Sequence, residues 1–457
     1  MQNFFAALIN VRRYRWSELF LLIFPSVFVT LGIVQLQLVA LSTNGTQPAT
    51  ITVTSLPFLD LFAPQILLIV ALLATHIIFS WLIPDGDQTL LPIVALLSSM
   101  GVLMATRLGP VLPYPVKELG LRQLVWVILG LGFCIATVWA TRNLNWLRLY
   151  KYTWALGGLA LVALTLGNAL RTKNFDSPTH DQLNIGFLGF AFQPSELLKI
   201  CLVIFYAAYL AENREMLSQA GTKVGPFYFP PLKHMGPLIA LLLVSLVMFV
   251  VLRELGLALL LFGVFVSMIY LASGRLTYVI YSLAGFGVGA TIAYRLFSYV
   301  QDRVYTVGHA FDPGVATNKG FQVVQGLIAL GSGGIIGVGF GLGHPNFVPA
   351  VQTDFVAAAI GEEFGMAGLF AIIAVFMLLI YRGFRIAIRA SDSFEQLLAG
   401  GISSIFAIQT LVILAGNLKI IPLTGIPLPF ITYGGSSVIA NFIMVGLLLR
   451  LSAPERA

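Results

Sequence analysis

The feature that most constrains this chain is the repetition of long apolar segments along nearly its whole length. From Ser17 to Leu451, apolar runs long enough to form spanning helices follow one another, separated by more polar connections. A helix that crosses the hydrocarbon core of a bilayer needs about 20 mostly apolar residues. The pattern therefore predicts an all-α fold, a polytopic integral membrane helical bundle.

We predict twelve membrane-spanning helices. The division of the seventh from the eighth rests on Arg253 and Glu254, which form a tight polar turn between two apolar runs. The predicted ranges are 17–41, 61–83, 88–106, 121–140, 152–170, 195–211, 235–252, 255–273, 276–296, 356–381, 397–416 and 433–451.

Composition supports a membrane protein and argues against nucleic-acid binding. Only 10% of the residues are charged and 58% are hydrophobic, whereas soluble domains carry about 25% charged residues. The net charge of +7 is spread over the connections and forms no long basic block, so we expect no nucleic-acid partner. Cys134 and Cys201 fall inside apolar runs, which favours buried packing residues over a disulfide or a metal site.

Basic residues in the short connections indicate the orientation. Lys and Arg are enriched on the cytoplasmic side of membrane proteins, and their distribution here favours a cytoplasmic N-terminus. The connection 382–396, with Arg382, Arg385 and Arg389, is the clearest single indication. Twelve spans then place the C-terminus in the cytoplasm as well. Three polar, Gly- and Pro-rich regions face outward: 171–194, the long loop 297–355, whose mixed composition suggests packed structure, and 417–436.

Charged residues at membrane depth are candidate functional residues, because burying them there is costly. Glu196 and Lys199 lie three residues apart at the outer end of the sixth predicted helix, so they share one face. They form either an internal ion pair or part of a binding site for a charged substrate. Pro194 suits the first turn of that helix, and Ser195 or Glu196 can satisfy its free amides.

Three further carboxylates lie at or near the start of the tenth predicted helix. Asp354 is either a helix cap or a general base at the membrane surface. Glu362 and Glu363 are adjacent, so we expect at most one of them to face a polar cavity, with a partner such as Lys199 or Arg303. A buried, paired carboxylate is the expected outcome.

Several nucleotide, metal and hydrolase sites are disfavoured. The glycine run Gly331–Gly343 lacks the Gly-Lys-Ser/Thr sequence of a nucleotide-binding P-loop. The main interpretation is that its glycines allow close backbone packing. The alternative is that its backbone amides bind a lipid pyrophosphate. The five histidines are scattered without the spacing of a zinc site. No serine-hydrolase signature is present.

Four ordered segments resemble the SEDS family of bacterial cell-wall polymerases, which includes RodA, FtsW and SpoVE. They are Phe192–Lys199 (FQPSELLK), Phe321–Gly341 (FQVVQGLIALGSGGIIGVGFG), Thr353–Phe355 with Gly361–Gly365 (TDF, GEEFG), and Pro422–Ser437 (PLTGIPLPFITYGGSS). Two departures stand out: Arg253–Gly256 replaces the usual Pro-Asp-Leu-Gly, and Lys419 replaces a common glycine. The resemblance implies a ten-helix core at 84–457 that includes the outer loop 297–355, preceded at 1–83 by a cytoplasmic tail and two extra helices.

The resemblance implies a peptidoglycan glycosyltransferase that polymerises lipid II at the outer face of the bacterial cytoplasmic membrane. It assigns Asp354 as the catalytic acid. It also implies a class B penicillin-binding protein as partner, membrane lipids as surroundings, and a divalent cation, Mg²⁺ or Mn²⁺, without an organic cofactor. The substrate-binding residues expected on this basis are Gln193, Ser195, Glu196, Lys199, Arg303, Gln325, Tyr433, Ser436 and Ser437. Two alternatives remain open: a lipid II flippase and a non-catalytic scaffold of the cell-wall synthesis complex.

Overall fold

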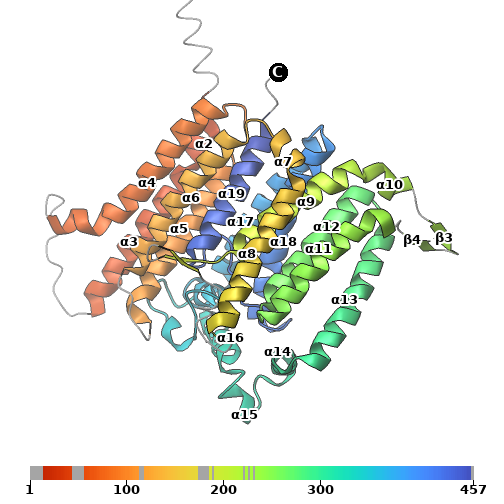
Figure 1. The fold of residues 1–457 in the computed structure, drawn as a ribbon. Helices are drawn as coiled ribbons and strands as arrows, with labels where there is room; N and C mark the ends of the chain where they lie inside the picture. The colour runs from red at the N-terminus through yellow and green to blue at the C-terminus, as the bar shows by residue number, and fades with distance from the viewer. Residues whose placement is uncertain are drawn as a thin grey trace, which may run out of the picture. The chain divides into compact units, whose positions relative to one another are not determined.

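The computed structural model describes residues 14–43, 56–112, 118–172, 185–187, 190–219, 222–224, 227–229 and 232–453. Over these ranges the chain is largely helical (Figure 1), which confirms the all-α class. The strands found there form two antiparallel hairpins: Ile185–Phe187 (β1) with Phe190–Phe192 (β2), and Thr222–Val224 (β3) with Phe227–Phe229 (β4). The predicted N-terminal tail up to residue 13, and much of the outer region 171–194, lie outside the described residues.

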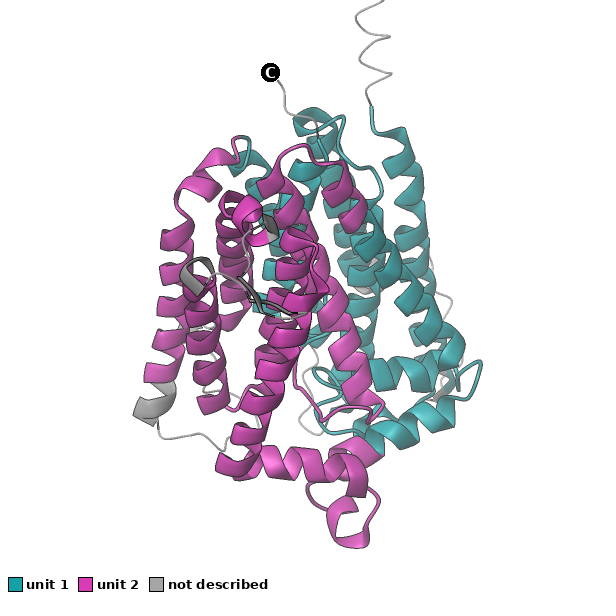
Figure 2. Cartoon of the chain, turned by 90° about the vertical axis from the view of Figure 1, so that its right-hand side faces the viewer, with its two compact units in different colours: residues 1–142, 325–382, 427–457 teal, residues 143–324, 383–426 magenta. Residues whose placement is uncertain are grey.

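The chain forms two compact units, which Figure 2 colours separately. Unit 1 consists of residues 1–142, 325–382 and 427–457, and unit 2 of residues 143–324 and 383–426. The predicted division into 1–83 and 84–457 follows a different criterion and stays a prediction.

Unit 1 contains the N-terminal and C-terminal helices. Its helices are α2 (Trp16–Leu21), α3 (Ile23–Thr43), α4 (Leu56–Leu82), α5 (Leu90–Leu108), α6 (Leu119–Ala140), most of α16 (Phe321–Gly333), most of α17 (Val356–Arg389) and α19 (Gly435–Ser452), with short 3-10 helices at Gly109–Val111 and Pro345–Phe347. The most extensive helix pair is α6 with α19. Glycines allow this close approach: a Cβ at Gly130 of α6 would meet the Phe442 ring, and one at Gly446 of α19 would lie 2.8 Å from the Cys134 carbonyl oxygen.

Unit 2 is built around the buried helix α9 (Ser195–Glu212). The other helices are α7 (Asn145–Leu149), α8 (Lys151–Thr172), α10 (Arg214–Gln219), α11 (Leu232–Val251), α12 (Leu255–Ser273), α13 (Leu276–Leu296), α14 (Ser298–His309), α15 (Pro313–Ala316) and α18 (Ser393–Asn417). Helices α8, α12 and α18 pack against α9, whose residues 198–210 are all buried. In contrast, α13 exposes apolar side chains such as Leu283 and Val288, as expected for a helix that faces lipid.

The predicted spans agree well with the helices. Nine described helical segments are long and apolar enough to cross a membrane, and each of the twelve predicted ranges coincides with helical structure. The other three predicted ranges, 152–170, 195–211 and 235–252, correspond to α8, α9 and α11, which are not among these nine segments. The turn at Arg253 and Glu254 does separate α11 from α12, and Arg253 adopts a positive φ of 63° there.

Two predictions about α17 and its surroundings need correction or refinement. The helix continues to Arg389, so Arg382, Arg385 and Arg389 lie on its last turns and not in a connecting loop. The helix is also broken at Gly365, which has φ 67° and ψ −172°. The outer loop 297–355 is packed structure, as its composition suggested, because α14, α15, α16 and the 3-10 helix Pro345–Phe347 lie within it.

Candidate functional site

Asp354 lies in a tight turn that leads into α17. Its backbone N–H donates to the Ala350 carbonyl oxygen over 3.0 Å, and Ala350 itself has a positive φ of 52°. The carbonyl of Phe355 accepts the N–H of Ala358 over 3.0 Å, so Phe355 occupies the N-cap position of α17 and Asp354 precedes it. The Asp354 residue is partly exposed.

A second loop is hydrogen-bonded to the Asp354 turn. The Tyr433 N–H donates to the Gln352 carbonyl oxygen over 3.1 Å, and the Thr432 hydroxyl contacts the Thr353 carbonyl oxygen over 3.3 Å. The same hydroxyl oxygen accepts the Leu428 N–H over 2.8 Å. Thr432 therefore joins the two loops and places Tyr433 beside the Asp354 turn. Two of the predicted site residues, Asp354 and Tyr433, thus lie in neighbouring loops.

The remaining predicted residues of unit 1 lie on the helices that flank these loops. Gln325 is on α16, and its neighbour Gly326 packs so closely on Phe355 that a Cβ there would meet the aromatic ring. Ser436 and Ser437 are buried in the first turn of α19. The Ser437 hydroxyl oxygen accepts a hydrogen bond from the Asn441 amide nitrogen over 3.4 Å.

In unit 2, Glu196 and Lys199 form the predicted ion pair. The Lys199 Nζ lies 2.7 Å from the Glu196 carboxylate and donates to the Gln409 side chain of α18 over 3.1 Å. The Lys199 side chain is 0% exposed and that of Glu196 is 1% exposed. Burial at this level is tolerated because each charge has its partner within the protein. A direct role in substrate binding stays a prediction.

The start of α9 differs from expectation in one detail. Pro194 occupies the N-cap position, and Gln193 immediately precedes it. The Ser195 hydroxyl is buried and has no hydrogen-bond partner among the described residues, so of the two side chains predicted to satisfy a free amide of the first turn, Ser195 does not do so.

Arg303 lies on α14 in a group of basic residues around Tyr299. One of its guanidinium nitrogens donates to the Leu423 carbonyl oxygen over 2.9 Å. The Arg253 guanidinium carbon lies 5.6 Å from the Tyr299 ring centroid, and the Tyr299 hydroxyl donates to the Val250 carbonyl oxygen over 2.6 Å. Burial raises the pKa of Tyr299 to about 12, although the positive charges of Arg303 and Arg253 oppose that rise. Two basic side chains, Arg253 and Arg303, therefore lie near Tyr299 together with the acid Glu254.

Glu362 and Glu363 are buried and paired, as expected, but their partners are different from those predicted. The Arg107 Nε donates to the Glu363 carboxylate over 2.9 Å. Glu362 accepts the His344 N–H over 2.8 Å. Among the described residues, only Glu363 pairs with a cation, which agrees with the expectation that at most one of the two acids would, while Glu362 accepts a backbone N–H from the loop after α16. The cation is Arg107, and not Lys199 or Arg303.

The glycine run packs its backbone against α17. The N–H groups of Val338 and Gly339 donate to the carbonyl oxygens of Glu362 and Glu363 over 3.0 and 3.1 Å. The Gly341 N–H donates to the Glu363 carboxylate over 3.2 Å. These three amides are already used within the protein, which supports close backbone packing for this stretch; an interaction of other amides of the run with a lipid pyrophosphate stays a prediction.

Comparison with known proteins decides the family. The family model of FtsW, RodA and SpoVE, described as cell cycle protein, matches residues 88–457. The chain belongs to the FtsW, RodA and SpoVE family. This is the SEDS family that the sequence segments predicted.

One relative and two solved structures define the match within the FtsW, RodA and SpoVE family. The peptidoglycan glycosyltransferase RodA of Mycobacterium tuberculosis is 35% identical over 450 residues, which cover 97% of this chain and 91% of the relative. A solved structure that describes the coordination of polymerization and crosslinking by a peptidoglycan synthase complex matches with a TM-score of 0.60 and 22% identity, covering 80% of this chain and 97% of that one. The Thermus thermophilus rod shape determining protein RodA matches with a TM-score of 0.56 and 22% identity, over 80% and 96% of the two chains. The two structures establish the shared fold.

The divalent cation expected for a member of this family finds no ligand set in either unit. Among the described residues, no group of three or more His, Cys, Asp or Glu side chains is arranged to hold a metal ion. The adjacent acids Glu362 and Glu363 are a poor fit, because Arg107 already neutralises Glu363 and backbone N–H groups already donate to both carboxylates, although one buried Glu362 oxygen has no partner among the described residues. We assign no metal ligands.

Proposed function

We propose that this protein is a peptidoglycan glycosyltransferase that polymerises lipid II into glycan strands at the outer face of the bacterial cytoplasmic membrane. The observation that carries the proposal is the alignment of 97% of the chain with a relative of that activity. The connection of the Asp354 turn to the 427–436 loop supports it, because a partly exposed carboxylate is held in place at the end of a helix.

Asp354 is the proposed general base. It accepts the proton of the acceptor GlcNAc 4-hydroxyl while that oxygen attacks the anomeric carbon of the donor MurNAc. The bond from this carbon to undecaprenyl pyrophosphate breaks, and the pyrophosphate leaves with the electron pair. A positioned general base contributes about 10²- to 10⁴-fold to the rate of such a step.

The negative charge that develops on the leaving group needs a nearby cation. Arg303 stays a predicted cation for this step; within unit 2 its guanidinium is partly buried and donates to the Leu423 carbonyl oxygen. Lys199 is a weaker candidate for direct contact, since it is fully buried and held by Glu196 and Gln409. Its proposed role is to position the outer end of α9.

The cellular setting of the reaction is also part of the proposal. The distribution of basic residues supports a cytoplasmic location of both termini and an outer location of the Asp354 turn, on the side where flipped lipid II presents its sugars. A class B penicillin-binding protein is the proposed partner, supported by the structural similarity to a synthase complex that coordinates polymerization with crosslinking. Membrane lipids surround the exposed apolar helices.

We also propose that a divalent cation assists the polymerisation. Removal of divalent cations with EDTA, followed by addition of Mg²⁺ or Mn²⁺, tests this requirement.

Polymerisation of purified lipid II by the purified protein with its penicillin-binding protein tests the function. We expect glycan strands from the wild type and a loss of about 10²-fold or more in rate for Asp354→Asn. Asp302→Asn is the matched control, because Asp302 is a half-exposed carboxylate paired with Lys319 on the surface. Equal rates for Asp354→Asn and wild type would remove Asp354 from the reaction. Translocation of labelled lipid II across vesicles without polymer would favour a flippase, and normal cell-wall synthesis by Asp354→Asn in cells would favour a scaffold.

A further inference from the structure

A cavity of about 480 Å³ lies in unit 1 at the C-terminal ends of α4, α6 and α19. Its lining includes Trp81, Ile83, Asp85, Arg142 and Arg450. The Asp354 turn is hydrogen-bonded near the other end of α19, and an 18-residue helix is roughly 27 Å long. The cavity is therefore separate from the proposed catalytic residues.

Two guanidinium groups, those of Arg142 and Arg450, line this cavity. Arg450 donates to the carbonyl oxygens of Thr141, Arg142 and Ala453 over 3.1, 2.9 and 3.5 Å, which fixes it against the ends of α6 and α19 and leaves its positive charge without a described counter-ion. Arg142 is exposed, and its guanidinium carbon lies 6.0 Å from the Trp139 ring centroid. Neither arginine forms an ion pair with any described acid, so their combined charge is available to an anion.

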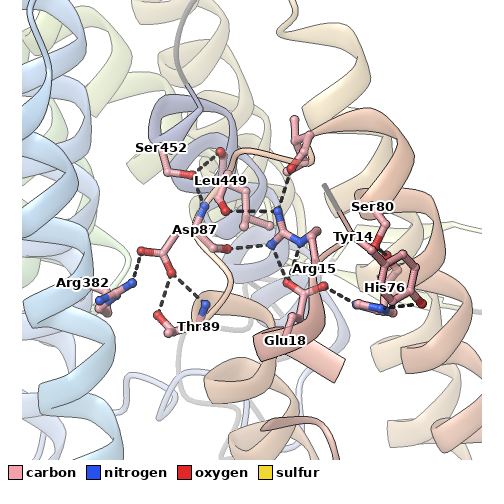
Figure 3. A network of polar contacts seen from close by, with 12 residues as sticks. Tyr14, Arg15, Glu18, His76, Ser80, Asp87, Thr89, Arg382, Leu449 and Ser452 are labelled. Carbon is pink, nitrogen blue, oxygen red and sulfur yellow. Dashed lines mark hydrogen bonds and ion pairs between the residues drawn. The ribbon is translucent and has the colours of Figure 1, made fainter. Parts of the chain in front are cut away.

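The wall opposite these arginines is held rigid by a buried network (Figure 3). Arg15, which is paired with Glu18, donates to the carbonyl oxygens of Ile83 and Gly86 over 2.7 and 3.3 Å. The Asp87 side chain accepts from Arg382 over 2.6 Å, and its backbone N–H donates to the Ser452 hydroxyl over 2.8 Å. The segment 83–87 is thereby tied to α2, α17 and α19.

The cavity lies at the level expected for lipid headgroups. Trp81 is 81% exposed at the end of α4, and Trp139 is exposed near the end of α6. Tryptophans at helix ends mark the interface between hydrocarbon and water. Basic pockets between membrane helices on the cytoplasmic side are suited to anionic headgroups, and the predicted orientation puts these helix ends in the cytoplasmic leaflet. Asp85, an exposed acid on the lining, adds an acceptor for a headgroup hydroxyl.

We propose that this cavity binds the headgroup of an anionic glycerophospholipid. The phosphodiester lies between Arg142 and Arg450, and Asp85 accepts a hydrogen bond from a headgroup hydroxyl. The acyl chains leave past Trp81 into the bilayer. The site would select a phosphate that is attached to both a glycerol backbone and a hydroxyl-bearing headgroup.

Native mass spectrometry of the full-length protein in detergent, titrated with phosphatidylglycerol, tests the proposal. We expect Arg142→Glu to weaken binding of the tightest lipid on the order of tenfold or more, because it reverses a charge at the headgroup. Arg389→Glu is the matched control, since Arg389 is also exposed, forms no ion pair with a described acid, and lies at the predicted cytoplasmic end of a helix. Thermal unfolding of each variant shows whether the fold is kept, and the milder Arg142→Gln serves if Arg142→Glu does not fold.

Each outcome bears on the site directly. Weaker binding in the Arg142 variants with unchanged binding in Arg389→Glu supports the cavity. Equal affinity of wild type and Arg142 variants, or equal affinity for phosphatidylglycerol and phosphatidylcholine, overturns it. If inorganic phosphate displaces the lipid at millimolar concentration, the site is one for free phosphate and the lipid assignment is wrong.

Discussion

The pair formed by Arg107 and Glu363 allows the sharpest test of how unit 1 is held together. The Glu363 side chain is 0% exposed and that of Arg107 is 11% exposed. Arg107→Ala leaves the carboxylate buried with only the Gly341 N–H at 3.2 Å, and it also removes a 2.8 Å hydrogen bond to the Gly343 carbonyl oxygen. Removing one partner of a buried pair costs about 3–5 kcal/mol. Arg107 lies at the edge of the buried region, so water can replace some of its hydrogen bonds after the substitution. We therefore expect Arg107→Ala to lower the free energy of unfolding by about 3 kcal/mol, the lower end of this range.

Unfolding of the detergent-purified protein, followed by tryptophan fluorescence, measures this loss. The double variant Arg107→Ala with Glu363→Gln removes the unpaired charge, so it should be more stable than Arg107→Ala alone by about 1–2 kcal/mol. Arg389→Ala is the control, since this exposed arginine forms no ion pair with a described acid. The reasoning is refuted if Arg107→Ala unfolds like the control, or if adding Glu363→Gln makes it less stable.

Three other variants probe the break in α17, an outer tyrosine and the buried ion pair. Gly365→Ala should destabilise the protein by roughly 3 kcal/mol or more, because its φ of 67° with ψ −172° suits glycine alone; an unchanged unfolding temperature contradicts this. Burial raises the pKa of Tyr299 to about 12, whereas an unfolded tyrosine has a pKa near 10. The contribution of Tyr299 to stability is therefore present below pH 10 and is lost as the pH rises to 12. Tyr299→Phe should make the free energy of unfolding fall less steeply over this pH range, and equal slopes for variant and wild type would exclude the effect. Lys199→Met should lower the free energy of unfolding by about 3 kcal/mol, because Glu196 stays buried and charged. Adding Glu196→Gln should restore part of the lost free energy. If it restores none, the loss comes from packing and not from the unpaired charge.

The helices could be predicted because a membrane-spanning helix is specified by its own residues. Each needs a long apolar run, and its backbone hydrogen bonds are satisfied within the segment. The pairing of Glu196 with Lys199 was predictable for a similar reason, since residues at i and i+3 share a helix face. Even the turn at Arg253 could be placed, because two adjacent charges interrupt the apolar sequence there.

The interactions between distant segments were not predictable in the same way. Arg107 and Glu363 are 256 positions apart, and the apolar pattern contains no signal that joins them. The break at Gly365 was also missed, because a glycine in an apolar helix is tolerated when neighbouring structure satisfies the freed amides. Here the Gly334 and Ile335 carbonyl oxygens accept the N–H groups of Met366 and Ala367 over 2.9 and 3.0 Å.

The amino-acid sequence is sufficient to show that this protein is a helical membrane protein, where its helices lie, and which segments resemble a cell-wall polymerase. These properties depend on local composition and order, which the chain carries whatever its neighbours are. Only the tertiary structure decided that the glycine run packs on α17, that Arg107 neutralises Glu363, and that Thr432 joins the Asp354 turn to the loop before α19. The physical reason is that buried charges and backbone amides take whichever partner the packed helices bring within hydrogen-bond distance, and that partner is fixed only when distant segments meet.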